Sequence, residues 1–359
     1  MTALKTALLR QIRAQGPISV AEYMTHCLLH PVHGYYATRD PLGAEGDFTT
    51  APEISQMYGE MLGLLMAQVW MDQGAPAPFT LAELGPGRGT LMADALRATA
   101  RVPGFHDSLR LHLVEVSEPL RAAQAARLGG FAPVWHNAAD SLPDQPLFLI
   151  ANEFFDALPI RQFLRQGTGW AERMVGARGD ELVFGLAPPA PLAALSHRLD
   201  DTEEGQFVET CAMARPVIET ISQKIARHGG FALIVDYGDW RSRGDTLQAV
   251  RRHVFDDPLA HPGKADLTAH VDFDALAAAA HPLRATRLTP QGVLLERLGI
   301  TARAEALARG LSSMALQSHV AAHRRLTHPE EMGHLFKALG LSPETAPPPP
   351  GFDPCRSRF

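Results

Sequence analysis

One short stretch of the chain, Glu83-Leu84-Gly85-Pro86-Gly87-Arg88-Gly89, places a carboxylate just before three glycines. The apolar run 79–84 and the amphipathic run 90–99 on either side predict a strand, a tight turn and a helix. Glycines at such a turn let the backbone approach a ligand and place it at the helix N-terminus. A dinucleotide-binding turn would have glycine or alanine where this chain has Thr90, and Glu83 would repel a pyrophosphate. The carboxylate instead suits a ligand that carries an ammonium group.

A second acidic residue, Glu115, stands at the end of the next predicted strand, 111–116. A carboxylate at that place can accept hydrogen bonds from both hydroxyls of an adenosine ribose. An ammonium group and an adenosine ribose occur together in S-adenosyl-L-methionine (SAM), so we predict SAM as the cofactor. The predicted cofactor contacts are Glu83, Gly85, Gly87, Gly89, Glu115, Asn137 and Asn152.

Polar residues also follow the fourth predicted strand, 147–151, in the run Ala151-Asn152-Glu153-Phe154-Phe155-Asp156-Ala157-Leu158-Pro159. The carboxyl end of this strand lies next to where the reactive methyl group of SAM is expected. Two carboxylates and an amide there can hold a cationic or amide substrate. We therefore predict Asn152, Glu153 and Asp156 as catalytic residues. The alternative is that they cap a helix and interact favourably with its dipole.

The N-terminal part of the chain contains a loop, 31–53, that is rich in glycine and proline. A long loop in a compact protein is often functional. We predict that Asp47, Thr50 and Glu53 belong to a lid over the cofactor or substrate. The alternative is that Thr50 or Ser55 caps a helix over 53–71.

Strands that alternate with helices from residue 78 onward predict an α/β protein with a class I, Rossmann-like methyltransferase fold and a mostly parallel, doubly wound sheet. Hairpin strands over 160–187 and a helix over 208–227 interrupt this order, whereas 240–275 is polar and loop-rich. Helices over 291–325 and a late strand over 335–341 follow. The predicted domains are an N-terminal helical region with the lid loop (1–75), a SAM-binding core (76–159 and 228–345), an inserted subdomain (160–227) and a loose proline-rich tail (346–359).

The first 21 residues contain three basic residues and no acidic one, which superficially resembles a transit peptide. However, Leu4, Leu8, Leu9 and Ile12 have the spacing of one helix face, and Gly16-Pro17 would end that helix. Ser19, with Glu22 three residues later, would then begin the next helix as a capping box. We therefore favour a structural helix at the N-terminus.

The overall composition excludes several function classes. The chain has 359 residues, 46% of them hydrophobic, and a net charge of −6, which disfavours a protein that coats nucleic acid. It has no apolar run of the length that a membrane span needs. Three distant cysteines argue against disulfides or a thiolate zinc site. His26, His30 and His33 have suggestive spacing, but Pro31 interrupts them, and we predict no metal.

Several motifs in a fixed order together resemble the MidA family, over about residues 1–341. The stretches that carry the resemblance are Gly46–Glu53, Glu83–Thr90, Asn152–Pro159, 244–248 and 265–273. The resemblance implies a SAM-dependent protein arginine N-methyltransferase related to the mitochondrial complex I assembly factor. Its partner would be a protein substrate, with a complex I subunit as one candidate. The lack of a clear leader before the family's first helix favours a bacterial, cytoplasmic member over a mitochondrial matrix protein.

Other functions remain open from the sequence. The acceptor could be a small molecule or another protein side chain, because SAM-dependent methyltransfer does not itself specify arginine. A SAM-binding assembly chaperone with little turnover is a second alternative, although a pure scaffold would not need the polar residues 152–156. The sequence leaves the oligomeric state undetermined.

Overall fold

The computed structural model describes residues 2–38 and 50–353, which form two compact units. The core unit comprises Thr49–Phe155, Pro216–Asp239 and Phe273–Phe359. The accessory unit comprises Met1–Phe48, Asp156–Arg215 and Trp240–Asp272. Each is described separately below.

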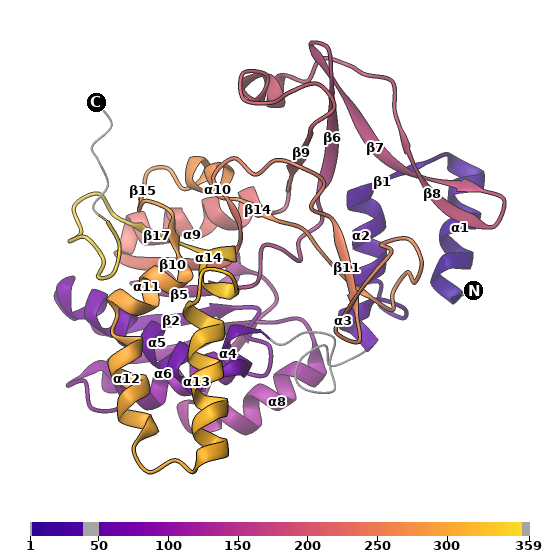
Figure 1. The fold of residues 1–359 in the computed structure, drawn as a ribbon. Helices are drawn as coiled ribbons and strands as arrows, with labels where there is room; N and C mark the ends of the chain where they lie inside the picture. The colour runs from indigo at the N-terminus through magenta and orange to yellow at the C-terminus, as the bar shows by residue number, and fades with distance from the viewer. Residues whose placement is uncertain (1, 39–49, 354–359) are drawn as a thin grey trace. The chain divides into compact units, whose positions relative to one another are not determined.

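The core unit is built on a sheet in the order β15-β17-β10-β5-β2-β3-β4. Figure 1 labels its strands β15, β17, β10, β5 and β2. Neighbouring strands from β10 to β4 are parallel, and β17 is antiparallel to β10. This arrangement confirms the predicted class I α/β fold with a mostly parallel sheet. The strands are β2 (Phe79–Leu84), β3 (Leu109–Val114), β4 (Val134–His136), β5 (Leu147–Asn152), β10 (Gly230–Asp239), β15 (Arg284–Ala285), β16 (Thr289–Pro290) and β17 (Phe336–Ser342).

The central strands are buried along their whole length, since β2 and β5 contain no exposed residue. Strands of this kind occur where helices cover both faces of a parallel sheet. The helices of the core unit are α4 (Ala51–Ile54), α5 (Gln56–Asp72), α6 (Thr90–Thr99), α7 (Phe105–Ser108), α8 (Glu118–Leu128), α9 (Ala214–His228, from Pro216 onward), α10 (Phe273–Ala279), α11 (Gln291–Arg297), α12 (Ile300–Ala308), α13 (Ser313–Thr327) and α14 (Met332–Leu335).

Helices α5 and α6 approach each other closely in the core unit. A Cβ atom on Gly63 of α5 would lie 2.5 Å from the Cα atom of Ala95 on α6, so this crossing requires glycine. The close packing fixes α5 beside the helix that follows the glycine turn. Tyr58, five residues earlier on α5, is buried in the interior of the unit.

The accessory unit contains two antiparallel sheets with N-terminal helices. One sheet has the order β1-β7-β6-β9 with β8 paired to β7, and the other has the order β12-β11-β13. The strands of these sheets are β1 (Ile18–Ser19), β6 (Arg161–Gln166), β7 (Gly169–Arg178), β8 (Glu181–Leu186), β9 (Phe207–Thr210), β11 (Gln248–Arg251), β12 (Val254–Asp256) and β13 (Asp266–Thr268), and the short strand β14 (Val271–Asp272) belongs to neither sheet. The helices are α1 (Ala3–Gln15), α2 (Val20–Leu29) and α3 (Tyr35–Thr38).

The N-terminal segment forms the expected structural helix, α1, which ends at Gly16. Its apolar face, which contains Leu4, Leu8, Leu9 and Ile12, is buried in the core of the accessory unit. The capping box predicted at Ser19 and Glu22 is present at the start of α2. None of the helices in the described ranges is long and apolar enough to cross a bilayer.

Three local predictions need correction. The segment 240–275, expected to be mainly loop, contains the three-stranded sheet of the accessory unit. The helix expected over 208–227 begins only at Ala214, because the alternating residues Phe207–Thr210 pair with β6 as a strand. The helix expected over 53–71 is interrupted at Ser55, which has an extended backbone and caps α5 with its side chain.

The two units also divide the chain differently from the predicted ranges. The N-terminal range 1–75 contributes to both units, since residues 2–38 belong to the accessory unit and residues 50–75 to the core unit. Residues 240–272 join the predicted insertion, and not the core, because their strands pair among themselves. The apolar periodicity of a sequence shows which segments are buried, but not which of two cores buries them.

Candidate functional site

The glycine turn joins β2 to α6 in the core unit, as predicted. Gly85, Gly87 and Gly89 have φ values of 58°, 53° and 75°, a region that glycine adopts without strain. Gly89 is the N-cap of α6, and the Gly85 N–H donates to the Val114 carbonyl at 3.0 Å. The turn therefore brings its backbone to the carboxyl ends of β2 and β3, where ligands of such sheets bind.

Glu83 is the next-to-last residue of β2, just before the glycine turn. It is buried, with 3% of its surface exposed. Burial raises the pKa of its carboxyl group to about 8. Its Oε2 atom has no hydrogen-bond partner among the residues that the structure describes. A buried carboxylate oxygen without a hydrogen-bond partner is costly, so a bound cation would both pair with Glu83 and favour its charged form.

Glu115 follows β3 and is held by groups on both carboxylate oxygens. The Ser117 N–H donates to Oε1 at 2.8 Å, and Gln124 Nε2 donates to Oε2 at 3.4 Å. Burial raises the pKa of Glu115, although these hydrogen bonds oppose the rise. Arg121 donates to the Glu115 carbonyl and, at 2.6 Å, to Oδ1 of the exposed Asn137. The structure thus brings two predicted cofactor contacts, Glu115 and Asn137, to one place.

Two further polar side chains lie at the carboxyl end of β5. The Glu153 N–H donates to the Val235 carbonyl at 2.9 Å, which extends the pairing of β5 with β10 by one residue. Glu153 Oε1 accepts from the Ala51 N–H at 3.0 Å and from Asn152 Nδ2 at 3.2 Å. The Glu153 backbone is left-handed, with φ of 50°. Non-glycine residues in that region cost stability and persist where their surroundings enforce them, often at functional sites.

Sequence reasoning did not identify Tyr58 and Asp236. Tyr58 donates from its hydroxyl to Oδ1 of Asn152, and Asp236 accepts from the Phe155 N–H at 2.9 Å. Burial raises the pKa of Tyr58, and the negative charges of Glu153, Asp236 and Glu83 raise it further. These acids therefore lie near one phenol in the core unit. The position of Asp236 directly after the apolar run 231–235 was the available sequence signal for that residue.

The predicted lid residues have different outcomes. Asp47 lies outside the described residues. Thr50 is the N-cap of α4 but makes no side-chain cap hydrogen bond. Glu53 Oε1 accepts from Thr90 Oγ1 at 2.6 Å, and Arg127 donates to the same hydroxyl at 2.7 Å. Glu53 is thus attached to the first residue of α6, and the lid role of these residues stays a prediction.

Asp156 belongs to the accessory unit, although it is three residues from Glu153 in sequence. It is buried, with 6% exposed, and its carbonyl oxygen accepts from the Ala269 N–H at 3.0 Å. This bond connects two segments of the accessory unit, 156–159 and 265–272, which are parts of two stretches singled out in the sequence. A catalytic role for Asp156 stays a prediction.

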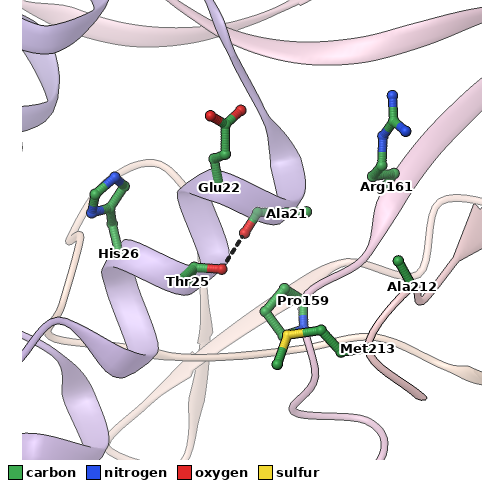
Figure 2. A pocket seen from close by; sticks show the side chains of 8 residues that line it. All are labelled: Ala21, Glu22, Thr25, His26, Pro159, Arg161, Ala212 and Met213. Carbon is green, nitrogen blue, oxygen red and sulfur yellow. Dashed lines mark hydrogen bonds between the residues drawn. The ribbon is translucent and has the colours of Figure 1, made fainter. Parts of the chain in front are cut away.

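A cavity of about 220 Å³ lies elsewhere in the accessory unit, between α2 and the start of β6 (Figure 2). Its charged side chains already have partners, since Glu22 accepts from the Ser19 N–H and Arg161 pairs with Glu172. Its other lining residues are mainly apolar, including Pro159 and Met213. In the described ranges, no group of His, Cys, Asp or Glu side chains is arranged to hold a metal ion. We therefore place the candidate site in the core unit.

We expect Tyr58→Phe to lower the methylation rate about five- to tenfold and to raise the Kd for SAM by no more than a similar factor, because Asn152 is a predicted cofactor contact as well as a predicted catalytic residue. The hydroxyl orients Asn152, and a net neutral hydrogen bond is worth about 1 kcal/mol. Steady-state rates and calorimetric titration of SAM measure the two effects separately. An unchanged rate would show that Asn152 needs no support from Tyr58.

Known proteins resemble this chain over nearly its whole length. Residues 61–291 match the model of a family described as S-adenosyl-L-methionine-dependent methyltransferases. The mitochondrial protein arginine methyltransferase NDUFAF7 of Xenopus tropicalis is 37% identical, over 98% of this chain and 89% of the relative. The Homo sapiens protein of that name is 36% identical, over 96% and 84%. A crystal structure from Burkholderia thailandensis, bound to S-adenosyl-homocysteine, has a TM-score of 0.81 and 30% identity and covers 98% of this chain and 93% of that one.

The site fits the cofactor that these comparisons imply. The unpartnered Glu83 oxygen suits an ammonium group, Glu115 suits ribose hydroxyls, and the glycine turn offers backbone close to both. S-adenosyl-homocysteine, present in the Burkholderia structure, is the form of SAM that remains after its methyl group has been transferred. Fold, site and sequence agree that the chain belongs to the MidA family and is a SAM-dependent methyltransferase.

Proposed function

We propose that the protein methylates arginine side chains of a protein acceptor. The carboxylate of Glu153 at the end of β5 is the observation that carries this proposal. It is fixed by Ala51 and Asn152 and lies near the buried Tyr58. The names of the NDUFAF7 relatives support arginine as the acceptor.

The residues of the core unit divide into cofactor binding and acceptor handling. SAM supplies a methyl group on a cationic sulfonium, which requires an aligned nucleophile more than a strong one. Glu83 would pair with the ammonium group, Glu115 would accept from the ribose hydroxyls, and the turn at Gly85–Gly89 would receive the remaining polar groups. Because these residues lie at or next to the ends of β2 and β3, they would hold the cofactor in one orientation.

An arginine acceptor requires a carboxylate because its guanidinium is always protonated in free form. Glu153 would accept hydrogen bonds from the guanidinium and hold its positive charge on the nitrogens that face the carboxylate. The remaining nitrogen would then regain lone-pair character as its proton passes to the Glu153 carboxylate. Asn152 would orient the acceptor through its amide, and a catalytic role for Asp156 is a separate proposal.

The identity of the acceptor protein is a finer proposal. The MidA resemblance favours a subunit of respiratory complex I, and we propose the bacterial cytoplasm as the location.

Labelled SAM tests the acceptor directly. The protein is incubated with lysate from a strain that lacks its gene, and mass spectrometry then identifies the labelled residues. We expect methylarginine on one or a few proteins, and no label when the enzyme is omitted. Label on lysine or on a small molecule would show that arginine is not the acceptor. Binding of SAM without transfer to any component would instead favour the assembly chaperone.

A further inference from the structure

Gln124 is a polar residue in an apolar position of α8. The buried residues of this helix are Leu120, Gln124 and Leu128, at intervals of four, and Gln124 is completely buried. A buried amide costs free energy unless its donors and acceptor are satisfied. The hydrogen-bond partners of the Gln124 amide therefore identify the groups that it positions.

The Gln124 amide connects three segments of the core unit. Its Nε2 atom donates to the Gly87 carbonyl at 2.7 Å and to Glu115 Oε2 at 3.4 Å. Its Oε1 atom accepts from Trp135 Nε1 on β4 at 2.8 Å. Its Cγ atom also lies 3.5 Å from where a Cβ atom on Gly89 would be.

Trp135 determines which way the amide faces. An indole N–H can only donate, so the oxygen of Gln124 must face Trp135. The two N–H groups are thereby directed toward Gly87 and Glu115, both of which present acceptors. A reversed amide would oppose donor to donor on one side and acceptor to acceptor on the other. The orientation of Gln124 is therefore fixed by its neighbours.

We propose that Gln124 is a positioning residue that couples the ribose-binding carboxylate to the glycine turn. The two parts of the cofactor site lie on separate segments, one after β2 and one after β3, and Gln124 bonds to both. The N–H donated to Glu115 also stabilises its charged form, which is the form that accepts from two hydroxyls. The proposal rests on the use of SAM and is independent of the acceptor.

Gln124→Met tests the proposal because methionine has a similar length and apolar stem but no amide. We expect the Kd for SAM and for S-adenosyl-homocysteine to rise about tenfold by calorimetry, while kcat at saturating SAM stays within about twofold. The affinity for SAM should also begin to fall at a higher pH than in the wild type as the solution is acidified. The reason is that loss of the Gln124 N–H raises the pKa of Glu115. Gln124→Glu should weaken binding more, since it places a carboxylate against two acceptors.

Leu120→Ala is the matched control, because it destabilises the same buried helix face without removing a hydrogen bond. It should lower the melting temperature and leave the Kd for SAM within about twofold. If Gln124→Met lowers only the melting temperature, or if Leu120→Ala weakens SAM binding equally, Gln124 is merely structural and the proposal is wrong. If the wild-type protein itself fails to bind SAM, the cofactor assignment is wrong. Titration of the wild type therefore distinguishes this outcome from a failure of the role proposed for Gln124.

Discussion

Glu83→Gln is expected to weaken SAM binding about a hundredfold or more. Glu83 is buried, and one of its carboxylate oxygens has no partner among the described residues. Removal of one member of a buried ion pair typically costs about 3–5 kcal/mol, and about 1.4 kcal/mol corresponds to a factor of ten in affinity. Calorimetric titration measures the loss. A Kd within threefold of the wild-type value would remove Glu83 from the cofactor site.

5′-Methylthioadenosine provides the matched control ligand, because it has the adenosine part of SAM but no ammonium or carboxylate group. Its affinity for the wild-type protein and for Glu83→Gln should be the same within about twofold. If both ligands bind the variant weakly, the substitution has disturbed the site as a whole.

The pKa of Glu83 adds a dependence on pH. Burial raises this pKa from 4.5 to about 8, so the carboxyl group is mainly neutral near neutral pH, and binding of an ammonium must release its proton. SAM affinity should therefore increase up to about tenfold per pH unit between about pH 6 and pH 7.5. Glu83→Gln should lose this slope.

Stability without ligand should respond in the opposite direction. A folded-state pKa above the unfolded value of 4.5 gives stability that is fully present below pH 4.5 and lost as pH rises through about 8. Glu83→Gln cannot ionise, so it should melt at a higher temperature than the wild type near pH 8 and at a similar temperature near pH 5. Thermal melts at the two pH values measure this difference.

Glu153→Gln should lower kcat about a hundredfold while the Kd for SAM stays within about threefold. The glutamine oxygen can still accept from Ala51 and Asn152, so the local structure should persist. What is lost is the negative charge that receives a guanidinium and its proton, and positioned acid–base groups contribute about 10²- to 10⁴-fold. Single-turnover rates with labelled SAM and the identified acceptor measure the effect.

Glu330→Gln is the control for this charge change, because the Glu330 side chain is 83% exposed in the turn between α13 and α14. Its rate should equal that of the wild type. A wild-type rate in Glu153→Gln would show that the carboxylate has no part in the reaction. A large loss of SAM affinity in the same variant would assign Glu153 to cofactor binding instead.

The central sheet and the glycine turn could be predicted because their signals are local. Apolar runs such as 79–84 and 147–151 are buried on both faces, and Gly85, Gly87 and Gly89 mark a turn that few other residues tolerate. The order of strand, turn and helix then follows from the chain itself. The carboxylates Glu83 and Glu115 could be recognised because each lies at or next to a strand end.

Contacts between distant segments could not be predicted in the same way. Tyr58 reaches Asn152 across 94 residues of sequence, and Asp236 reaches Phe155 across 81. The short polar strands of 240–272 become strands only because they pair with one another. For Gln124, the buried position could be predicted, because it lies between Leu120 and Leu128 on one helix face. Its three hydrogen-bond partners could not be predicted, because they lie on other segments.

The left-handed backbone at Glu153 implies a conflict between catalytic activity and folding stability. Glycine would relieve the strain at φ of 50°, but it would also remove the oxygen to which Ala51 and Asn152 donate. Because these two effects oppose each other, Glu153→Gly should fold about as stably as the wild type even though it loses the carboxylate. A library selected only for thermal resistance would therefore accept glycine at this position, whereas one selected for turnover would retain glutamate. Comparison of the two selections would show whether glutamate is retained at residue 153 for activity at the expense of stability.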